Sequence, residues 1–340
     1  MSPVDPSSER VRVGVVGVGH LGRHHVRLLA QNPRAHLVGV ADVRGDAVAQ
    51  AAETHGCLGT TDFRELIGRV DAVSVVVPTA LHREVAGAFL ENGVDVLVEK
   101  PITPREAEGR ELVAIARREH RVLQVGHVER FNPAYGALRE RGIEPRYVES
   151  QRLAPFSFRS TDIGVVLDLM IHDLDIVLSL VRSPVAAVRA YGGALFTAKE
   201  DMASATLEFE NGAVAQLTAS RVALKPVRKL RVFSRDAYAS IDFAEHSGVL
   251  IRKNAGWDVG KLDIGSVDTS RIDDLWKYVF EGLLSVDRYQ IGERNPLAEE
   301  LDAFLVAVQQ RSEPEVTGED GCAAVGLAHR VLDAIRAHPW

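Results

Sequence analysis

Cysteine is scarce in this sequence. The only two cysteines, Cys57 and Cys322, stand far apart in a chain of 340 residues and match no metal-ligand spacing. They exclude the dense disulfide framework of a small secreted domain. We therefore expect free thiols, no bound metal and a protein that works in the reducing environment of the cytoplasm.

Long apolar runs and an excess of positive charge are also absent. No uninterrupted apolar stretch approaches the roughly 20 residues that span a bilayer. Residues 1–9 lack the basic start and apolar core of a signal peptide. The formal net charge of −7 disfavours nucleic acids and membranes as partners, although it permits a local basic pocket.

The composition is that of an ordinary globular protein, with 46% hydrophobic and 26% charged residues. The length suffices for two domains, each with its own core. From residue 11 to about residue 125, short apolar runs alternate with helical stretches, which predicts a doubly wound parallel sheet in an α/β domain. The expected strands are Val11–Val16, His36–Ala41, Ala72–Val77, Val94–Val98 and Val122–Val125.

Three glycines follow the first expected strand. Gly17, Gly19 and Gly22 have the spacing G-x-G-x-x-G and lead into a helical stretch. The first permits a tight turn, the second lets a pyrophosphate approach the backbone, and the third lets the helix pack closely on the strand. The free N–H groups at the helix start then face the phosphates. We expect a dinucleotide site here, with contacts from His20 and Leu21; the alternative is a glycine-rich turn in another kind of α/β protein.

An acidic residue follows the second expected strand. Asp42 stands twenty residues after Gly22, where a carboxylate can accept hydrogen bonds from the adenosine ribose and would repel a 2′-phosphate. This position favours NAD over NADP. Arg44 is a cofactor-binding candidate too, and because it could hold a 2′-phosphate, NADP stays an alternative.

Further polar residues fall at the carboxyl ends of the expected strands, where ligands of such sheets bind. We expect Pro78, Thr79, His82 and Glu99 to contact the cofactor. His82 could equally be an exposed residue at a helix start.

Lys100 would stand at the same sheet edge, beside the nicotinamide end of the cofactor. Positive charge on the oxidised ring would favour the neutral amine, which can relay a proton from a substrate hydroxyl. Pro101 restricts Lys100 to an extended backbone, which fixes its direction. The alternative is a solvated surface lysine.

After about residue 126 the pattern changes. A long helical stretch, Gly164–Val181, precedes consecutive strand-like runs, which predicts a second, α+β domain with an antiparallel or mixed sheet. The runs are Ala186–Gly192, Ser204–Glu210, Ala213–Ala219, Lys229–Phe233 and Ala237–Phe243, and an Asn-Gly pair between the second and third is a hairpin signal.

The expected domain boundaries are 1–126 and 127–340, and the helix over 319–337 could pack back on the first domain. A sheet with helices on only one face needs a cover for the other. We therefore expect a homodimer or homotetramer built through this sheet.

The helical stretch carries acidic residues around a histidine. Asp168 and His172 are i and i+4, and Asp175 follows three residues later, so all three share one helix face. An imidazole between carboxylates can act as a general base. A metal site and a histidine bonded inside the core are the alternatives. Asp173 lies off that face, either in solvent or as a support for its neighbours.

Other cations could meet a substrate. His127 and Arg130 lie at the expected domain junction, where hydrogen bonds within the junction are the alternative role. From Arg221 to Arg235 six basic residues occur without an acid. They could clamp a phosphate or diphosphate with Arg159, or else form a solvated strand face.

The glycine fingerprint running into His25, the run Glu99-Lys100-Pro101 and the pair Asp168…His172 together resemble the glucose–fructose oxidoreductase, inositol dehydrogenase and MocA family. This resemblance covers nearly the whole chain. It implies an N-terminal Rossmann domain, a C-terminal domain with a large open sheet, and NAD(P)-dependent oxidation of sugar or cyclitol hydroxyls. It also implies that Lys100, Asp168 and His172 are the catalytic residues.

Two segments, Gly126–Pro133 and Asp162–Asp175, further resemble the UDP-N-acetylglucosamine 3-dehydrogenases. These serve synthesis of the diamino sugar of lipid A in bacteria. The resemblance implies a nucleotide-sugar substrate. We expect this substrate to contact Lys100, Asp168 and His172 and, from their positions and charges, also His127, Arg130, Arg159 and Arg221. The alternatives are an inositol, free-sugar or dihydrodiol dehydrogenase, and a non-catalytic regulator that binds the dinucleotide.

Overall fold

A computed structural model describes residues 10–157, 163–254, 284–290 and 294–338. The described chain divides into two compact units. The first comprises residues within Met1–Phe131 and Arg294–Arg330, and the second those within Asn132–Glu293 and Val331–Trp340. None of the described helices is long and apolar enough to cross a membrane.

The first unit contains a six-stranded sheet in the order β3-β2-β1-β4-β5-β6, and every neighbouring pair is parallel. This confirms the predicted doubly wound parallel sheet. Its strands are β1 (Val11–Val16), β2 (Ala35–Ala41), β3 (Leu58–Thr60), β4 (Ala72–Val75), β5 (Asp95–Glu99) and β6 (Leu123–Gly126). The sequence reasoning missed β3, because three residues around Gly59 give no periodic apolar signal.

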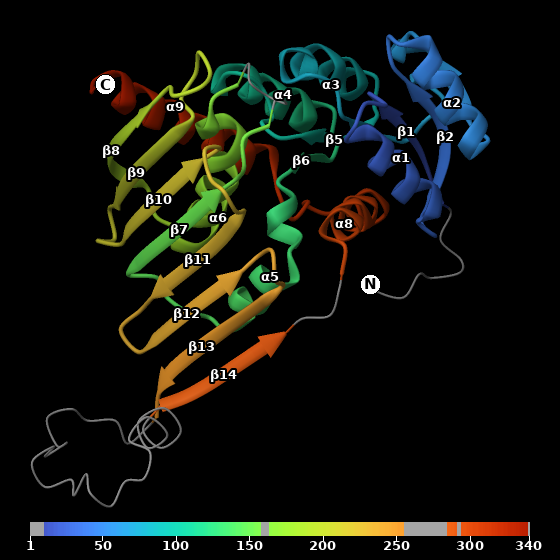
Figure 1. Ribbon diagram of the computed structural model, residues 1–340. Coiled ribbons are helices and arrows are strands. Elements are labelled where there is room, and N and C mark those ends of the chain that lie inside the picture. Colours follow the sequence, from blue (N-terminus) through green and yellow to red (C-terminus); the bar gives the residue numbers. More distant parts are fainter. Residues whose placement is uncertain (1–9, 158–162, 255–283, 291–293, 339–340) are drawn as a thin grey trace, which may run out of the picture. The chain divides into compact units, whose positions relative to one another are not determined.

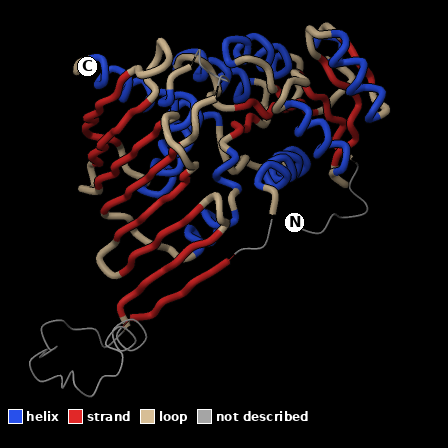
Figure 2. The backbone as a smooth tube through the Cα atoms, viewed as in Figure 1, coloured by secondary structure: helices blue, strands red, loops and turns tan. Residues whose placement is uncertain are grey.

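Helices cover both faces of this sheet (Figures 1 and 2). They are α1 (Gly22–Gln31), α2 (Gly45–His55), α3 (His82–Glu91), α4 (Glu106–Arg118) and α8 (Pro296–Gln310), with short helices η1 (Phe63–Leu66), η2 (Thr79–Leu81) and η3 (Val128–Phe131). Helix α8 comes from the far end of the chain, yet its Leu301, Phe304 and Leu305 belong to the core that β1 and α1 build.

Most of helix α9 (Gly318–Arg336) also belongs to the first unit. Small residues let α9 pack closely on β6 and α4. A Cβ on Gly321 of α9 would lie 2.7 Å from a methyl of Val125, and a Cβ on Gly109 of α4 would lie 2.8 Å from Cys322 Sγ. The first unit therefore also takes in residues 127–131, α8 and α9 up to Arg330. Amphipathic spacing predicts these helices, but it does not reveal which core their apolar faces enter.

The second unit contains an eight-stranded sheet in the order β14-β13-β12-β11-β7-β10-β9-β8. All neighbours are antiparallel except β7 and β10, so the sheet is mostly antiparallel, as predicted. The strands are β7 (Tyr147–Leu153), β8 (Val185–Gly193), β9 (Met202–Phe209), β10 (Val214–Ser220), β11 (Val227–Phe233), β12 (Ala237–Asp242), β13 (Ser247–Lys253) and β14 (Leu284–Gln290).

Helices α5 (Pro133–Glu140) and α6 (Ile171–Val181), together with η4 (Val166–Met170), pack on one face of this sheet (Figure 1). The hairpin predicted at the Asn-Gly pair joins β9 to β10, and Gly212 has the positive φ of 78° that the turn requires. Strand β7 was not predicted, because Glu149 and Arg152 within it obscure the alternation. It lies between β11, which pairs with it antiparallel, and β10, which pairs with it parallel.

Candidate active site

The glycine turn has the shape that a dinucleotide requires. Gly17 has a φ of 95°, and a Cβ there would strike the Val76 carbonyl, while a Cβ on Gly22 would strike the Gly17 carbonyl. A Cβ on Gly19 would meet only the Arg44 guanidinium, at 3.7 Å, so the backbone at this point is open to an approaching group. The residues present thus fit a pyrophosphate at the start of α1.

Asp42 is fixed at the rim of this turn. Its carboxylate accepts a hydrogen bond from the Val18 N–H at 2.8 Å and from Arg44 Nε at 3.1 Å. Burial acts to raise the pKa of Asp42, but the hydrogen bonds from Arg44 and Val18 outweigh it, and the pKa is lowered. The carboxylate is therefore ionised at neutral pH and can accept hydrogen bonds from a ribose.

His20, Leu21 and Arg44 are exposed around the same turn. A hollow of about 510 Å³ between α1 and α2 is lined by Gly19, His20 and Arg44 among others, whereas Leu21 is not part of its lining. Because the Arg44 fork is held by Asp42 at the mouth of the hollow, both residues can contact the adenosine half of a cofactor.

Glu99 is the last residue of strand β5, and Lys100 follows it directly. Glu99 is buried, its carboxylate lies 3.2 Å from His25 Nε2, and the other ring nitrogen of His25 lies 2.9 Å from Ser74 Oγ. The Lys100 N–H donates to the same carboxylate at 3.2 Å. Burial acts to raise the pKa of Glu99, but His25 and Lys100 outweigh it and the pKa is lowered.

Glu99 therefore fixes the backbone from which the half-buried Lys100 projects. Gly126 makes room for it, since a Cβ there would lie 3.0 Å from the carboxyl carbon of Glu99. The sequence reasoning expected Glu99 to touch the cofactor and did not foresee the buried chain Ser74–His25–Glu99 behind Lys100. The sequence feature that points to this buried chain is His25, which lies on the apolar, buried face of α1.

Pro78 and Thr79 lie at the end of β4, where Pro78 caps η2. His82 is buried, not exposed, and its ring nitrogens lie 2.9 Å from the carbonyls of Val77 and Pro101. Burial lowers its pKa. His82 thus ties the end of β4 to the segment after Lys100, and the cofactor contact expected of it stays a prediction.

His127 and Arg130 are buried inside the first unit. Burial and the charges of Arg130 and Lys100 lower the pKa of His127 to about 3, so its imidazole is neutral at physiological pH. Arg130 Nη2 lies 3.5 Å from Asp320 Oδ2, which joins η3 to the start of α9. Substrate contacts from these two residues stay predictions.

In the second unit, Asp168 and His172 lie in a distorted helix. Asp168 is within η4, a π-helical turn, and His172 is in the first turn of α6; both side chains are half-buried. Wide turns of this kind occur often at functional sites. The uniform helical pattern over Gly164–Val181 does not reveal this distortion, which no glycine or proline marks.

Asp173 is buried rather than solvated. It forms a two-pronged ion pair with Arg152 of β7, at 2.8 and 3.0 Å, and Asp175 is buried beside it on α6. The pair anchors α6, and with it His172, on the central strand of the sheet. Among the described residues no three His, Cys, Asp or Glu side chains gather as metal ligands.

The basic stretch does not form one cluster. Arg221 is buried, lies 3.8 Å from Asp201 and donates to the Ile163 carbonyl, so it joins loops within the unit. Lys229 and Arg231 lie on the face of β11 away from the helices and pair with acids of neighbouring strands. Arg159 lies outside the described residues, and the substrate contact expected of Arg221 stays a prediction.

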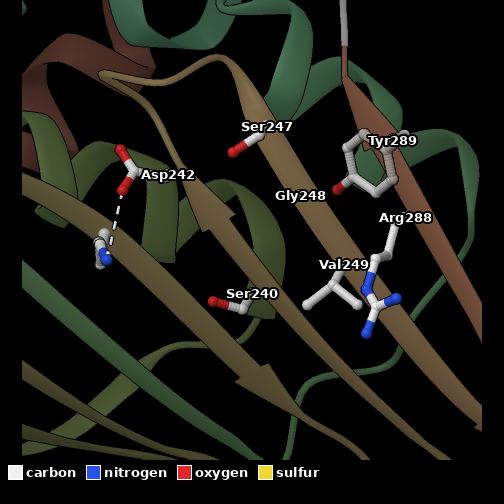
Figure 3. A pocket seen from close by; sticks show the side chains of 8 residues that line it. Ser240, Asp242, Ser247, Gly248, Val249, Arg288 and Tyr289 are labelled. Atoms are coloured by element: carbon white, nitrogen blue, oxygen red, sulfur yellow. Dashed lines mark ion pairs between the residues drawn. The ribbon is translucent and has the colours of Figure 1, made fainter.

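A polar hollow of about 620 Å³ lies over β11–β14 (Figure 3). Lys229 pairs with Asp242 at 3.4 Å, and Ser240, Val249 and Arg288 occupy paired positions on adjacent strands. Neither Asp168 nor His172 lines it. Its lining is that of a sheet surface, and its Lys229 and Asp242 are paired with each other.

Comparison with known proteins matches both units to domains of one enzyme family. A family model described as "Oxidoreductase family, NAD-binding Rossmann fold" matches residues 11–127, and one described as "GFO/IDH/MocA C-terminal domain" matches residues 143–239. The chain is 38% identical over 96% of its length, and 98% of the relative's, to the UDP-N-acetylglucosamine 3-dehydrogenase of Acidithiobacillus ferrooxidans.

A solved structure of that enzyme matches with a TM-score of 0.85 at 36% identity, covering 96% of this chain and 98% of that one. The scyllo-inositol 2-dehydrogenase (NAD(+)) of Bacillus subtilis is 31% identical over 62% of this chain and 68% of its own. Together with the open glycine turn and the ionised Asp42, these matches establish that the chain belongs to the GFO/IDH/MocA family of NAD-binding oxidoreductases.

Proposed function

We propose that this protein is an NAD-dependent dehydrogenase that oxidises the 3-hydroxyl of UDP-N-acetylglucosamine to a ketone. The observation that carries the proposal is the 38% identity over nearly both full lengths with an enzyme of that name. The ketone is the group that a transamination would convert to an amine. We therefore place the reaction in synthesis of the diamino sugar of lipid A.

Three residues supply the proposed catalytic groups. Lys100 directly follows β5, Asp168 belongs to η4, and His172 belongs to α6. His172 accepts the proton of the substrate hydroxyl, Asp168 orients and polarises His172, and Lys100 hydrogen-bonds the same oxygen. Bound NAD supplies the acceptor for the two electrons and hydrogen that leave the sugar carbon.

The cofactor would be held by residues of the first unit alone. Gly17, Gly19 and Gly22 admit the pyrophosphate, and Asp42 accepts hydrogen bonds from the ribose. Contacts from His20, Leu21, Arg44, Pro78, Thr79 and His82 belong to the same proposal. Glu99 fixes the backbone of Lys100, so its part in cofactor binding is indirect.

Inositol oxidation is the second candidate, because a scyllo-inositol dehydrogenase is 31% identical over part of the chain. We further propose that the protein acts in the cytoplasm, since both Cys57 and Cys322 are free. We also propose a homodimer or homotetramer. Within the described residues, the helices of the second unit pack on one face of its sheet (Figure 1), so a second subunit can cover the other face.

A substrate panel tests the proposed activity. NADH absorbance is followed with NAD and UDP-N-acetylglucosamine, free N-acetylglucosamine, glucose and scyllo-inositol. The proposal requires turnover with the nucleotide sugar at a kcat/KM at least about a hundredfold above that for the free sugars. Turnover confined to inositol would select the second candidate.

The variant Lys100→Met tests the catalytic assignment. We expect turnover to fall by a factor of about 10²–10⁴, as for loss of a group that assists proton transfer. The Kd for NAD, measured by calorimetry, should change less than about threefold, because Lys100→Met leaves the glycine turn and Asp42 intact. Equal loss of turnover and NAD binding would show that Lys100 is structural.

A further inference from the structure

Apolar side chains gather on one exposed surface of the second unit. Phe156, Leu195 and Phe196 are 36%, 50% and 65% exposed, and Leu224 is fully exposed. The rings of Phe156 and Phe196 meet edge to face, with centroids 5.5 Å apart and planes at 82°. We call these four residues the aromatic lip. Water-facing aromatic rings in contact indicate a binding surface more than a folding core.

The loops that carry the aromatic lip are held rigidly. The buried carboxylate of Asp201 accepts hydrogen bonds from the N–H groups of Leu195, Phe196 and Thr197, at 2.6–2.9 Å. These bonds lower the pKa of Asp201 to about 2 despite the opposing effect of burial. The loop after β8 therefore has a fixed shape, and Phe196 is presented without an ordering cost on binding.

Backbone hydrogen bonds join the segments that carry the aromatic lip: the loop with Phe196, the loop with Leu224 and the segment with Phe156. The Arg221 N–H donates to the Asp201 carbonyl at 2.9 Å, and the Ala223 N–H donates to the Ala154 carbonyl at 3.2 Å. The segments around Phe156, Phe196 and Leu224 are thus parts of one connected surface at the end of β7 and β10.

The same loop supports the segment that carries Asp168. The Val165 N–H donates to the Glu200 carbonyl at 3.0 Å, and the Asp168 N–H donates to the Gly164 carbonyl at 3.0 Å. A Cβ on Gly164 would strike a carboxylate oxygen of Glu200, which accepts a hydrogen bond from the Val166 N–H at 3.3 Å, so a side chain there would displace the Glu200 carboxylate. The aromatic lip therefore adjoins the start of the helical segment to which the proposed catalytic Asp168 belongs.

The loops of the aromatic lip are rich in cations. Lys199, Lys225 and Arg228 are exposed, and neither 194–199 nor 221–228 contains an acid. In a protein with a formal net charge of −7 this is a local excess of positive charge. Exposed aromatic faces beside exposed cations complement a planar base that carries phosphates. The two carboxylates of the same loop, Glu200 and Asp201, are occupied by hydrogen bonds from backbone N–H groups.

We propose that the aromatic lip binds the uracil ring of the nucleotide sugar, with its diphosphate meeting Lys199 and Lys225. This inference rests on the proposed function, for which it supplies the site that distinguishes a UDP-sugar from a free sugar. The base stacks on the face of Phe196, the more exposed ring, with Phe156 perpendicular beside it, and the phosphates pair with the cations. The sugar, which is the only reacting part of the substrate, then extends toward Asp168.

Calorimetry with UDP alone tests the inference on the full-length protein. Phe196→Ala should weaken UDP binding about 5- to 150-fold, the range expected for the loss of one base–aromatic stack. KM for the nucleotide sugar should rise by a similar factor while kcat at saturation stays within about threefold. The Kd for NAD should not change. Tyr191→Ala removes another exposed ring of the same unit and should leave UDP binding unchanged.

Two further variants separate stacking from folding and from charge. Phe196→Trp keeps an aromatic face and should restore UDP binding to within about threefold of wild type. Lys225→Glu should weaken binding of UDP but not of uridine, since only UDP carries phosphates.

The outcomes distinguish this inference from the proposed function. A wild-type protein that neither binds UDP nor oxidises the nucleotide sugar refutes the proposed function. A wild-type protein that oxidises it, with UDP binding unchanged in Phe196→Ala and Phe156→Ala, refutes the aromatic lip alone. Dissociation of an oligomer by these variants without loss of UDP affinity would refute it too, by showing that the lip is a subunit contact.

Discussion

At the scale of a residue, Glu300 is the most unusual group in the described chain. It is fully buried on α8, and among the described residues neither carboxyl oxygen has a hydrogen-bond partner. Burial and the charge of Glu99, itself paired with His25 and next to Lys100, raise the pKa of Glu300 well above 4.5. The folded protein therefore carries Glu300 protonated at a pH where the unfolded chain ionises it.

This difference makes stability depend on pH. Stability from protonated Glu300 is fully present below pH 4.5 and is lost as pH rises toward its raised pKa in the fold. Glu300→Gln keeps the shape and cannot ionise, so its gain in urea midpoint over wild type should grow steadily from pH 5 to pH 8. The control is Glu53→Gln on the exposed face of α2, whose urea midpoint should differ from wild type by the same amount at every pH. If the difference for Glu300→Gln were also constant with pH, Glu300 would be ionised in the folded protein.

At the scale of an element, the position of α6 depends on one ion pair. Arg152 of β7 and Asp173 of α6 are 5% and 3% exposed. Asp173→Ala leaves a buried guanidinium without its carboxylate, which should cost about 3–5 kcal/mol in the free energy of unfolding. Urea denaturation measures this loss, and kcat should fall with it because α6 carries His172.

The exposed ion pair of Arg64 and Glu84 is the matched control. Its side chains are 58% and 59% exposed, so Glu84→Ala should cost less than about 1 kcal/mol and leave kcat unchanged. Equal effects of Asp173→Ala and Glu84→Ala would show that α6 is held by its apolar packing alone.

At the scale of the whole molecule, the proposed subunit contact is the face of the second unit's sheet that lies opposite its helices. The rings of Tyr147, Phe233 and Tyr238 contact one another there at tilted angles, with centroids 5.8 and 4.9 Å apart, beside the paired Arg231 and Glu149. We expect light scattering to give a dimer or tetramer for wild type and a mass near 37.1 kDa for Phe233→Arg, whose added charge would be buried without a partner.

Phe196→Ala, away from that face, should keep the assembly of wild type. A wild-type protein of monomer mass would remove the oligomer from the proposal without affecting the catalytic assignment.

Much of the cofactor site could be predicted from the sequence, because its signals are local. Gly17, Gly19 and Gly22 are adjacent in the chain, and Asp42 follows the next strand at a fixed spacing. The regular alternation up to residue 125 likewise predicts the parallel sheet, since a period of two or 3.6 residues shows in any short window. Short β3 and charged β7 were not predicted, because they lack that period. Strands β13 and β14 were not predicted either, because they lie in the largely polar stretch after residue 244.

By itself the sequence determined the two kinds of sheet, the glycine turn and the residue types offered for proton transfer, since each depends on neighbours within a few positions. Only the tertiary structure decided that Glu99 is held by His25, that Asp173 is buried against Arg152, and that α8 and most of α9 return to the first unit. Those outcomes depend on contacts between residues tens to hundreds of positions apart. A periodic pattern shows that a face will be buried, but not which distant side chains will cover it.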